Sequence, residues 1–322
     1  MKLGVFAVLF SQKKFEEALD AIVEQGVTYV EIGAGGYVGD AHCPASVLLQ
    51  DHERLMRTKK ALRDRGISVS ALSVHGNPLH PNKEIAQAHH QAFVNAVKLA
   101  NEFETDTIIT FAGCPGDSEE AKYPNWVTAT WPTDFREILE WQWKEKVVPY
   151  WQEQAEFCKR HGVKVAIEPH PGFVVYNTET AIRLRHSTGD NIGVNFDPSH
   201  LFWQQIDPVA AIKKLGEERM IYHVHAKDTT LDKQNIALNG VLDTKPYSQV
   251  SKRSWIFRTV GYGHGMEVWK EIISALQAIN YDGVISIEHE DGLMSINEGL
   301  SKAVAFLKDI IILEKNDGMW WD

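Results

Sequence analysis

The most regular feature of the chain is an alternation of short apolar segments with longer amphipathic ones. The apolar segments are rich in β-branched residues and recur eight times, at residues 3–10, 28–32, 68–74, 107–111, 163–168, 192–197, 221–225 and 284–288. Most of the intervening stretches have the spacing of apolar side chains that is typical of a helix, as at residues 15–25, 55–65, 85–101, 178–185 and 268–279. Several of these end in a glycine, which suits the left-handed turn after a helix: Gly26, Gly66, Gly162 and Gly283.

This alternation predicts a parallel sheet covered by helices. Eight repeats fit a closed (β/α)8 TIM barrel, an α/β fold, better than an open doubly wound sheet. No Gly-x-Gly-x-x-Gly follows the first strand to indicate a dinucleotide-binding fold. Because no Pro/Gly/Ser-rich linker interrupts the pattern, residues 1–322 are predicted to form a single domain. The connections between strands 4 and 5 and between strands 7 and 8 (about residues 229–282) are long.

Composition and charge narrow the class of protein. With 44% apolar residues, a chain of 322 residues can bury one large core. A net charge of −10 disfavours binding to nucleic acid or to anionic membranes. Cys43, Cys114 and Cys158 show no Cys-x-x-Cys spacing and indicate reduced thiols. Residues 1–10 lack a signal-peptide cleavage site and are interpreted as the first strand. We therefore expect a cytoplasmic protein that binds neither nucleic acid nor membrane.

Side-chain parity indicates which residues face the barrel axis. Successive residues of a strand point to opposite faces, and in the fifth strand the β-branched residues share one face while Glu168 ends the other. The sixth, seventh and eighth strands repeat this pattern with Asp197, His225 and Glu288. All four residues come at the carboxyl ends of their strands, which is where the active sites of TIM barrels lie.

Each of these residues also has a structural explanation when it is taken alone. The carboxylate of Glu168 can accept hydrogen bonds from loop amides, and Asp197 before Pro198 has the pattern of a helix N-cap. His225 fits a hydrogen-bonded core histidine, and Glu288 fits a solvated strand end beside other charges. Only the four residues taken together indicate a functional site.

As a group, the four residues indicate a metal site. A barrel places the ends of strands 5 to 8 side by side, so that three carboxylates and one imidazole converge. Like charges in one cleft repel each other unless they are protonated or neutralised. A divalent cation neutralises them, and a set of three oxygen ligands and one nitrogen suits Mn²⁺, Mg²⁺ or Co²⁺.

Further residues are expected around this site. His200 lies one helical turn after the sixth strand and is expected to point into the same mouth. His223 and Lys227 share the inward parity of His225 at different depths, and His223 fits a buried core partner equally well. His75 ends the third strand in the right position to line the pocket.

The two long connections carry additional candidates. Arg258 and His264 lie in the connection before strand 8, where a loop of this length is often a lid or a binding loop. Trp126 and Trp131 lie in the loop after strand 4 and are the better candidates for stacking on a sugar, because the later tryptophans have helical spacing. The aromatic segment 319–322 is apolar enough to dock on the barrel or on a second subunit, which makes a homo-oligomer a further prediction.

These residues and motifs resemble those of the xylose-isomerase-like TIM barrels, a family of sugar isomerases and epimerases related to AP endonucleases. The resemblance covers essentially the whole chain, and its most specific motifs lie at residues 167–169, 195–200, 223–228 and 287–288. It implies that His200 contacts substrate. It also implies one divalent metal ion, with Mn²⁺ before Mg²⁺, Co²⁺ or Zn²⁺, held by Glu168, Asp197, His225 and Glu288.

The resemblance also implies a reaction. The metal ion would polarise the carbonyl of a keto-sugar, a sugar derivative or a cyclitol. Glu168 and Glu288 would take and return a proton through a metal-bound enediolate. The residues expected to contact this small-molecule substrate are His75, His200, His223, Lys227, Arg258 and His264.

Departures from the family pattern keep other functions open. Ketose 3-epimerases of this type carry a second glutamate six residues after the one on strand 5, where this chain has Val174. A lyase or dehydratase that expels a β-leaving group from a keto-sugar, keto-glycoside or inosose is therefore an alternative. An AP-endonuclease needs further histidine and aspartate ligands, which residues 110–113 and 260–264 do not supply. A non-catalytic sugar-binding barrel is the remaining alternative.

Overall fold

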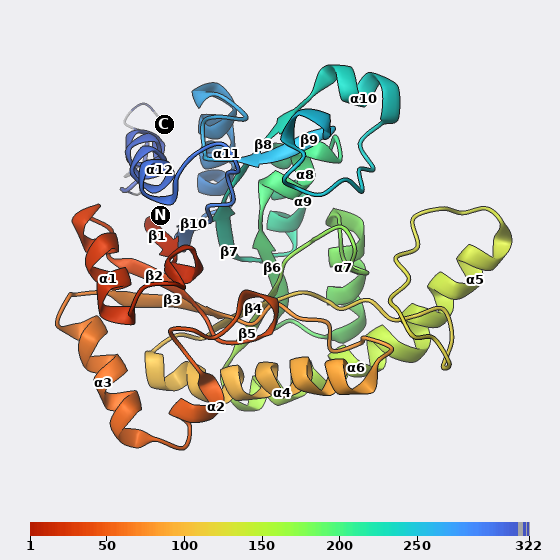
Figure 1. Ribbon diagram of the computed structural model, residues 1–322, viewed down its shortest axis with the longest axis horizontal. Helices are drawn as coiled ribbons and strands as arrows, with labels where there is room; N and C mark the ends of the chain where they lie inside the picture. Colours follow the sequence, from red (N-terminus) through yellow and green to blue (C-terminus); the bar gives the residue numbers. More distant parts are fainter. Residues whose placement is uncertain (315–317, 320, 322) are drawn as a thin grey trace.

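The computed structural model of the protein describes residues 1–314, 318, 319 and 321, and it has a strand at each of the eight predicted positions. These strands are β1 (Lys2–Phe6), β2 (Tyr29–Gly33), β3 (Ser68–Ser73), β4 (Thr107–Thr110), β5 (Lys164–Ile167), β6 (Ile192–Phe196), β7 (Ile221–Ala226) and β10 (Val284–Ile287). They are hydrogen-bonded in parallel in the order β1-β10-β7-β6-β5-β4-β3-β2, which closes a barrel. The predicted (β/α)8 TIM barrel is confirmed (Figure 1).

Most of the helices cover the outside of the barrel. The α-helices are α1 (Phe15–Glu24), α2 (Ala45–Leu48), α3 (His52–Arg63), α4 (Lys83–Ala100), α5 (Thr133–Trp141), α6 (Val148–Arg160), α7 (Thr178–Thr188), α8 (Pro198–Trp203), α9 (Pro208–Glu217), α10 (Lys233–Asn239), α11 (Met266–Ala278) and α12 (Ile296–Ile310). Short 3-10 helices span Ala7–Phe10, Gly36–Val38, Asn101–Phe103 and Val250–Lys252, and a π-helical turn spans Gln142–Val147.

Strand parity decides which side chains meet the helices. Val165 and Ile167 of β5 belong to the same buried cluster as Trp151 of α6. Ala166 faces the other way and packs inside the barrel with Ala71 and Ile109. The inner face of β5 therefore leads directly to the residue that follows it, Glu168, at the carboxyl-terminal mouth.

The first strand is shorter than its apolar run suggests. A strand was expected over residues 3–10, but β1 ends at Phe6 and a 3-10 helix continues over Ala7–Phe10. Ala7 and Phe10 are buried there. An apolar run reports burial and does not distinguish a buried strand from a buried helical turn, so this boundary was predicted wrongly.

The connection from β7 to β10 carries structure that the sequence pattern did not predict. An antiparallel pair, β8 (Asp228–Leu231) and β9 (Trp255–Arg258), brackets α10 and the loop after it, and α11 then returns to the barrel. Figure 1 shows β8, β9 and α10 projecting together from the barrel. Because β8 directly follows β7, this hairpin, which we call the insertion (residues 228–258), stands at the carboxyl-terminal mouth.

The two ends of the described chain come close together. The amino group of Met1 donates to the carbonyl oxygen of Ile312 over 3.0 Å. Of the aromatic segment 319–322, residues 320 and 322 lie outside the described residues, while Met319 and Trp321 are exposed. Homo-oligomerisation therefore stays a prediction. Across the part of the chain that the structure describes, every helix is too short or too polar to cross a membrane.

Candidate metal centre

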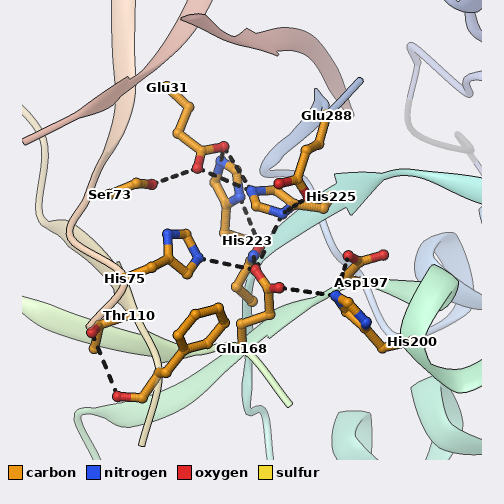
Figure 2. A network of polar contacts seen from close by, with 12 residues as sticks. Glu31, Ser73, His75, Thr110, Glu168, Asp197, His200, His223, His225 and Glu288 are labelled. Carbon is orange, nitrogen blue, oxygen red and sulfur yellow. Dashed lines mark hydrogen bonds and ion pairs between the residues drawn. The ribbon is translucent and has the colours of Figure 1, made fainter. Parts of the chain in front are cut away.

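Four neighbouring strand ends bring their ionisable side chains together (Figure 2). Glu168 follows β5, Asp197 follows β6, His225 lies in β7 and Glu288 follows β10. One potential ligand atom from each of these residues lies within 4.8 Å of the others. Glu168, Asp197 and His225 are buried and Glu288 is nearly so, so water screens their mutual repulsion poorly. We call these four residues the ligand cluster.

Asp197 uses its two carboxylate oxygens for different purposes. Oδ1 accepts a hydrogen bond of 2.8 Å from the backbone N–H of Ser199 and caps α8. Oδ2 is buried and accepts no well-directed hydrogen bond from the described residues, although it lies 3.2 Å from Nε2 of His200. The helix-cap interpretation and the metal interpretation of Asp197 are therefore compatible.

Glu31, inside β2, determines how His225 presents its ring. Nε2 of His225 lies 2.9 and 3.0 Å from the two carboxylate oxygens of Glu31, which also accepts a hydrogen bond from Ser73. Burial alone would raise the pKa of Glu31, but the charge and hydrogen bond of His225 outweigh it and lower the pKa to about 2. The ionised carboxylate accepts a hydrogen bond from the Nε2–H group, so Nδ1 is the atom that His225 presents to the ligand cluster.

Nδ1 of His225 faces two carboxylates of the cluster. It lies 3.0 Å from Oε2 of Glu288 and 3.3 Å from Oε2 of Glu168. Burial opposes a charge on this ring, yet the carboxylates of Glu31 and Glu288 raise the pKa of His225 well above its usual value. A proton and a metal ion therefore compete for the same nitrogen lone pair.

Glu168 is held by donors on several sides. Asn195 donates to its Oε2 over 2.9 Å, and Nε2 of His75 lies 3.1 Å from the same oxygen. Nε2 of His200 lies 3.3 Å from Oε1. Burial alone would raise the pKa of Glu168, but hydrogen bonds from His200, His225 and His75 hold it well below its usual range. The carboxylate is thus ionised and fixed in place.

His75 owes its position to a glycine. Gly36 has a φ of +72°, and a Cβ atom on it would lie 2.0 Å from the carbonyl oxygen of His75. The N–H of Tyr37 donates to that same oxygen over 2.7 Å. Only a residue without a side chain permits this close approach, and it anchors the segment that directs His75 toward Glu168.

Lys227 places an ammonium group beside the ligand cluster. Its Nζ lies 2.7 Å from Oε2 of Glu288, 3.1 Å from Oδ2 of Asp197 and 3.1 Å from Oε2 of Glu290. Burial would lower the pKa of Lys227, but these carboxylates raise it well above its usual value. His200 behaves similarly: burial lowers its pKa, Asp197 raises it, and the result is about 9. Both side chains offset negative charge in the cluster.

His223 lies on the inner face of β7, two residues before His225. Its Nδ1 lies 3.0 Å from Oδ1 of Asn195, and its Nε2 lies 3.3 Å from Oγ of Ser70. Burial lowers the pKa of His223 to about 4, so the ring is neutral. His223 therefore lies beneath the ligand cluster, where it contacts the side-chain amide of Asn195, which in turn holds Glu168. Its contact with substrate stays a prediction.

In the structure, Arg258 and His264 each contact a carboxylate that is not part of the ligand cluster. Nε of Arg258 donates to Oδ2 of Asp291 over 3.0 Å. Nδ1 of His264 lies 2.8 Å from Oδ1 of Asp228, and its ring stacks on Phe202 with centroids 3.7 Å apart. Their expected contact with substrate stays a prediction.

Sequence reasoning missed Glu31. It is a fully buried carboxylate whose strand neighbours, Val30 and Ile32, belong to the core between strands and helices. The signal was present, since a single charged residue inside the apolar run of residues 29–33 must point to the barrel axis by parity. Together with His223 and His225, Glu31 forms a second group of potential ligands deeper in the barrel.

Comparison with known proteins adds one close relative and several structural ones. The chain is 34% identical to the uncharacterized protein YfiH of Bacillus subtilis (strain 168) over 314 aligned residues. The alignment covers 97% of this chain and 99% of YfiH. Three solved structures superimpose on 96–97% of the chain.

These structures are the IolI protein with a bound zinc atom, the probable 3-DHS dehydratase AsbF of Bacillus anthracis, and a D-psicose 3-epimerase in the presence of D-fructose. The superpositions cover 98%, 99% and 99% of these chains, with TM-scores of 0.66, 0.65 and 0.61 and sequence identities of 17%, 18% and 16%. At such identities the similarity establishes the fold alone. The sequence profile of the xylose isomerase-like TIM barrels matches residues 19–310, and the chain belongs to that family.

Proposed function

We propose that the protein is a divalent-metal-dependent isomerase or epimerase that acts on a keto-sugar, a sugar derivative or a cyclitol. One observation carries this proposal. Oδ2 of Asp197, Nδ1 of His225 and Oε2 of Glu288 are buried, lack a well-directed hydrogen bond within the described structure, and converge with the carboxylate of Glu168. Buried polar atoms normally make well-directed hydrogen bonds, whereas these three are held only by ion pairs with one another, with Lys227 and with His200. A cation at their centre is the partner that fits them.

A divalent cation fits this donor set. Glu168, Asp197, His225 and Glu288 would hold it through three oxygens and one nitrogen, a set that suits Mn²⁺ first and also Mg²⁺, Co²⁺ or Zn²⁺. The structurally similar IolI protein holds zinc. When bound, the ion supplies Lewis-acid polarisation of a carbonyl oxygen.

Residues of the chain then transfer the proton to and from the substrate. Hydrogen bonds keep Glu168 ionised, and it accepts a proton from the carbon beside the carbonyl, which leaves an enediolate. Glu288, across the cluster, receives a proton from the ammonium group of Lys227, 2.7 Å from its Oε2, and delivers it at the neighbouring carbon or at the opposite face of the same carbon. The proton on Glu168 then passes to water, and Lys227 takes one back. Asn195 and His75 hold Glu168 in position, and His200 is placed to hydrogen-bond a substrate oxygen.

A lyase or dehydratase reaction is the second candidate, and one residue favours it. The position where ketose 3-epimerases of this type carry a second glutamate holds Val174, which is buried with only 4% exposure. With a single glutamate on this side, the enediolate can instead expel a leaving group from the β-carbon. Both reaction types occur on this fold, as the D-psicose 3-epimerase and the probable dehydratase AsbF illustrate.

The test combines metal content with proton exchange. Metal bound per chain is measured in wild type and in Glu168→Gln, both purified without chelator, and keto-sugars and cyclitol ketones are then screened for deuterium uptake from ²H₂O. We expect about one metal ion per chain. We also expect deuterium uptake that falls about 10²- to 10⁴-fold in the variant.

Each of the other possible outcomes would support a different function. Three zinc ions per chain would revive the AP-endonuclease alternative. If metal still fails to bind after Mn²⁺ or Co²⁺ is added back, the four-residue site is wrong and a sugar-binding barrel becomes the better interpretation. Loss of a β-substituent without recovery of an isomer would identify the lyase reaction.

A further inference from the structure

The motif that contains Glu168 also contains a histidine that the proposed reaction does not use. Residues 168–172 read Glu-Pro-His-Pro-Gly, so His170 lies two residues after Glu168. The N–H of Phe173 donates to the carbonyl oxygen of His170 over 3.1 Å, and Gly172 has a φ of +99°. Proline at the second position and a glycine with positive φ at the third are the pattern of a type II turn. The motif therefore builds a tight turn directly after β5 and fixes the backbone of His170.

The ring of His170 lies beside both the ligand cluster and the insertion. Its centroid is 4.1 Å from that of His200, whose Nε2 lies 3.3 Å from Oε1 of Glu168. His170 also lines two neighbouring cavities, of about 230 and 310 Å³, together with Tyr247 and Phe257 of the insertion. His200 lines the smaller cavity as well, so this cavity meets the ligand cluster and can receive the reacting ring of a substrate.

The two ring nitrogens of His170 have different surroundings. Nδ1 lies 2.6 Å from the carbonyl oxygen of Pro171, which can only accept, so Nδ1 carries a proton. Nε2 has no hydrogen-bond partner among the described residues. The fully enclosed polar atoms that lack a partner do not include Nε2, so it is open to the space beside the ring. Because His170 lines both cavities, a ligand in that space can reach Nε2.

The charges around the two cavities indicate the kind of group that Nε2 would bind. Among the described residues that line them, the acidic ones are Asp243 and Glu290, and lysine and arginine are absent. His200 also lines the smaller cavity, but its Nε2 faces the carboxylates of Glu168 and Asp197. Such a lining attracts hydrogen-bond donors and disfavours a phosphate or carboxylate group. A hydroxyl group both donates and accepts, so the cavities fit a neutral polyhydroxylated ligand.

We propose that His170 is a substrate-binding residue whose Nε2 hydrogen-bonds a hydroxyl group of the reacting sugar or cyclitol, next to the oxygen that His200 contacts. This inference rests on the proposed function for the identity of the ligand. The contact itself requires no chemistry, so binding alone can test it.

The test measures the binding of polyols that cannot react. Xylitol, D-sorbitol and myo-inositol are titrated into the protein by calorimetry in the presence of Mn²⁺, and the one that binds most tightly is used for the variants. His170→Asn places an amide near the position of Nδ1, so it keeps the donor to Pro171 and loses Nε2. We expect it to weaken polyol binding about three- to tenfold, the effect of one hydrogen bond. His170→Gln places its amide near the position of Nε2 and should bind within about twofold of wild type.

His161→Asn is the matched control. Nδ1 of His161 lies 2.9 Å from the carbonyl oxygen of Phe157, a contact of the same kind, but His161 precedes β5 and so lies at the opposite end of the barrel from the ligand cluster. Its replacement should leave polyol binding unchanged. Monodeoxy derivatives of the polyol add a readout that a structural role would not alter. Wild type and His170→Asn should bind equally well the derivative that lacks the contacted hydroxyl.

Three results would overturn the inference: no binding of any polyol to wild type, equal binding by wild type and His170→Asn, or a loss in His170→Asn that is the same for every deoxy derivative. Failure of the proposed function appears separately. Deuterium uptake would then be absent while polyol binding and its loss in His170→Asn persist.

Discussion

Nε2 of His225 lies 2.9 Å from Oε2 of Glu31, so a residue outside the ligand cluster determines which nitrogen of His225 enters it. Glu31→Gln removes the charge that holds the Nε2 proton while preserving the size of the side chain. We expect the affinity for Mn²⁺ or Co²⁺ to fall about 10- to 100-fold, the usual effect of losing a carboxylate partner of a ligating histidine. Titration calorimetry, or competition with a chelator of known affinity, measures this change.

Glu290→Gln is the matched control for that measurement. Glu290 also lies beside the cluster, 3.1 Å from Nζ of Lys227, but its side chain is 49% exposed and His225 is not among its partners in the described structure. Its replacement should change metal affinity much less. If Glu31→Gln and Glu290→Gln bind metal equally well, the buried carboxylate does not orient His225.

The ammonium group of Lys227 is predicted to stabilise the protein most when no metal is bound. It lies between the carboxylates of Asp197 and Glu288 with 2% of its side chain exposed. Lys227→Met leaves those buried charges unpaired, which should lower the free energy of unfolding by about 3–5 kcal/mol in the presence of chelator. Saturating Mn²⁺ should recover part of this loss, because the cation replaces the missing positive charge.

Urea unfolding with EDTA and with Mn²⁺ measures both effects. Lys164→Met removes a lysine whose pair with Asp106 is about half exposed, and it should change the free energy of unfolding by less than about 1 kcal/mol. If Lys227→Met is as stable as wild type in EDTA, the carboxylates of the cluster are protonated and Lys227 does not neutralise them.

The ligand cluster could be predicted from sequence because every member lies at a strand end. Parity assigns the face of each side chain, and the barrel order assigns its neighbours, so no knowledge of loops was needed for Glu168, Asp197, His225 and Glu288. Glu31 obeys the same parity but lies inside β2, which β1 and β10 separate from β7 in the closed barrel. The side chains of Glu31 and His225 meet across the barrel interior. Strand order predicts contacts only between adjacent strands, so it does not predict this one.

The insertion could not be predicted by the same means. The expected contact of Arg258 and His264 with substrate rests only on their place in a long connection and stays a prediction. The shape of such a loop depends on distant contacts. Asp228 accepts from the backbone N–H groups of Gly261 and His264, more than thirty residues later. The resulting hairpin has no local periodicity to reveal it, so it appears only in the folded chain.

Burial of the cysteine thiols predicts a loss of stability at high pH. Cys43 is fully buried, and burial, assisted by the charge of Asp40, raises its pKa from 9.0 to about 12. The folded state therefore holds the thiol proton more tightly than the unfolded state does. Its contribution is fully present below pH 9 and is lost as the pH rises toward 12, with a slope of about 1.4 kcal/mol per pH unit.

Comparing wild type with Cys43→Ala isolates this contribution, because the buried tyrosines titrate in both proteins. The difference in their free energies of unfolding should be constant up to pH 9 and should then shrink between pH 9 and 11. A difference independent of pH over that range would mean that Cys43 titrates alike in the folded and unfolded chains.

His264 is predicted to stabilise the insertion through its contact with Asp228. Its ring lies 2.8 Å from Oδ1 of Asp228 and stacks on Phe202, while Trp269 donates to Oδ2 over 3.1 Å. Both His264→Ala and Asp228→Asn should lower the free energy of unfolding, by about 1–3 kcal/mol for the lost hydrogen bonds. The exposed His186, replaced by Ala, should change it by less than about 0.5 kcal/mol.

The kinetic readout separates this role from the contact with substrate expected from sequence. A residue that only anchors the hairpin leaves KM close to wild type below the unfolding temperature, and the fall in stability tracks that of Asp228→Asn. A residue that binds substrate raises KM while the free energy of unfolding stays unchanged. Because the carboxylate of Asp228 already accepts a hydrogen bond from Nδ1 of His264, we expect the first pattern. The second would mean that the ring turns away from Asp228 when substrate binds.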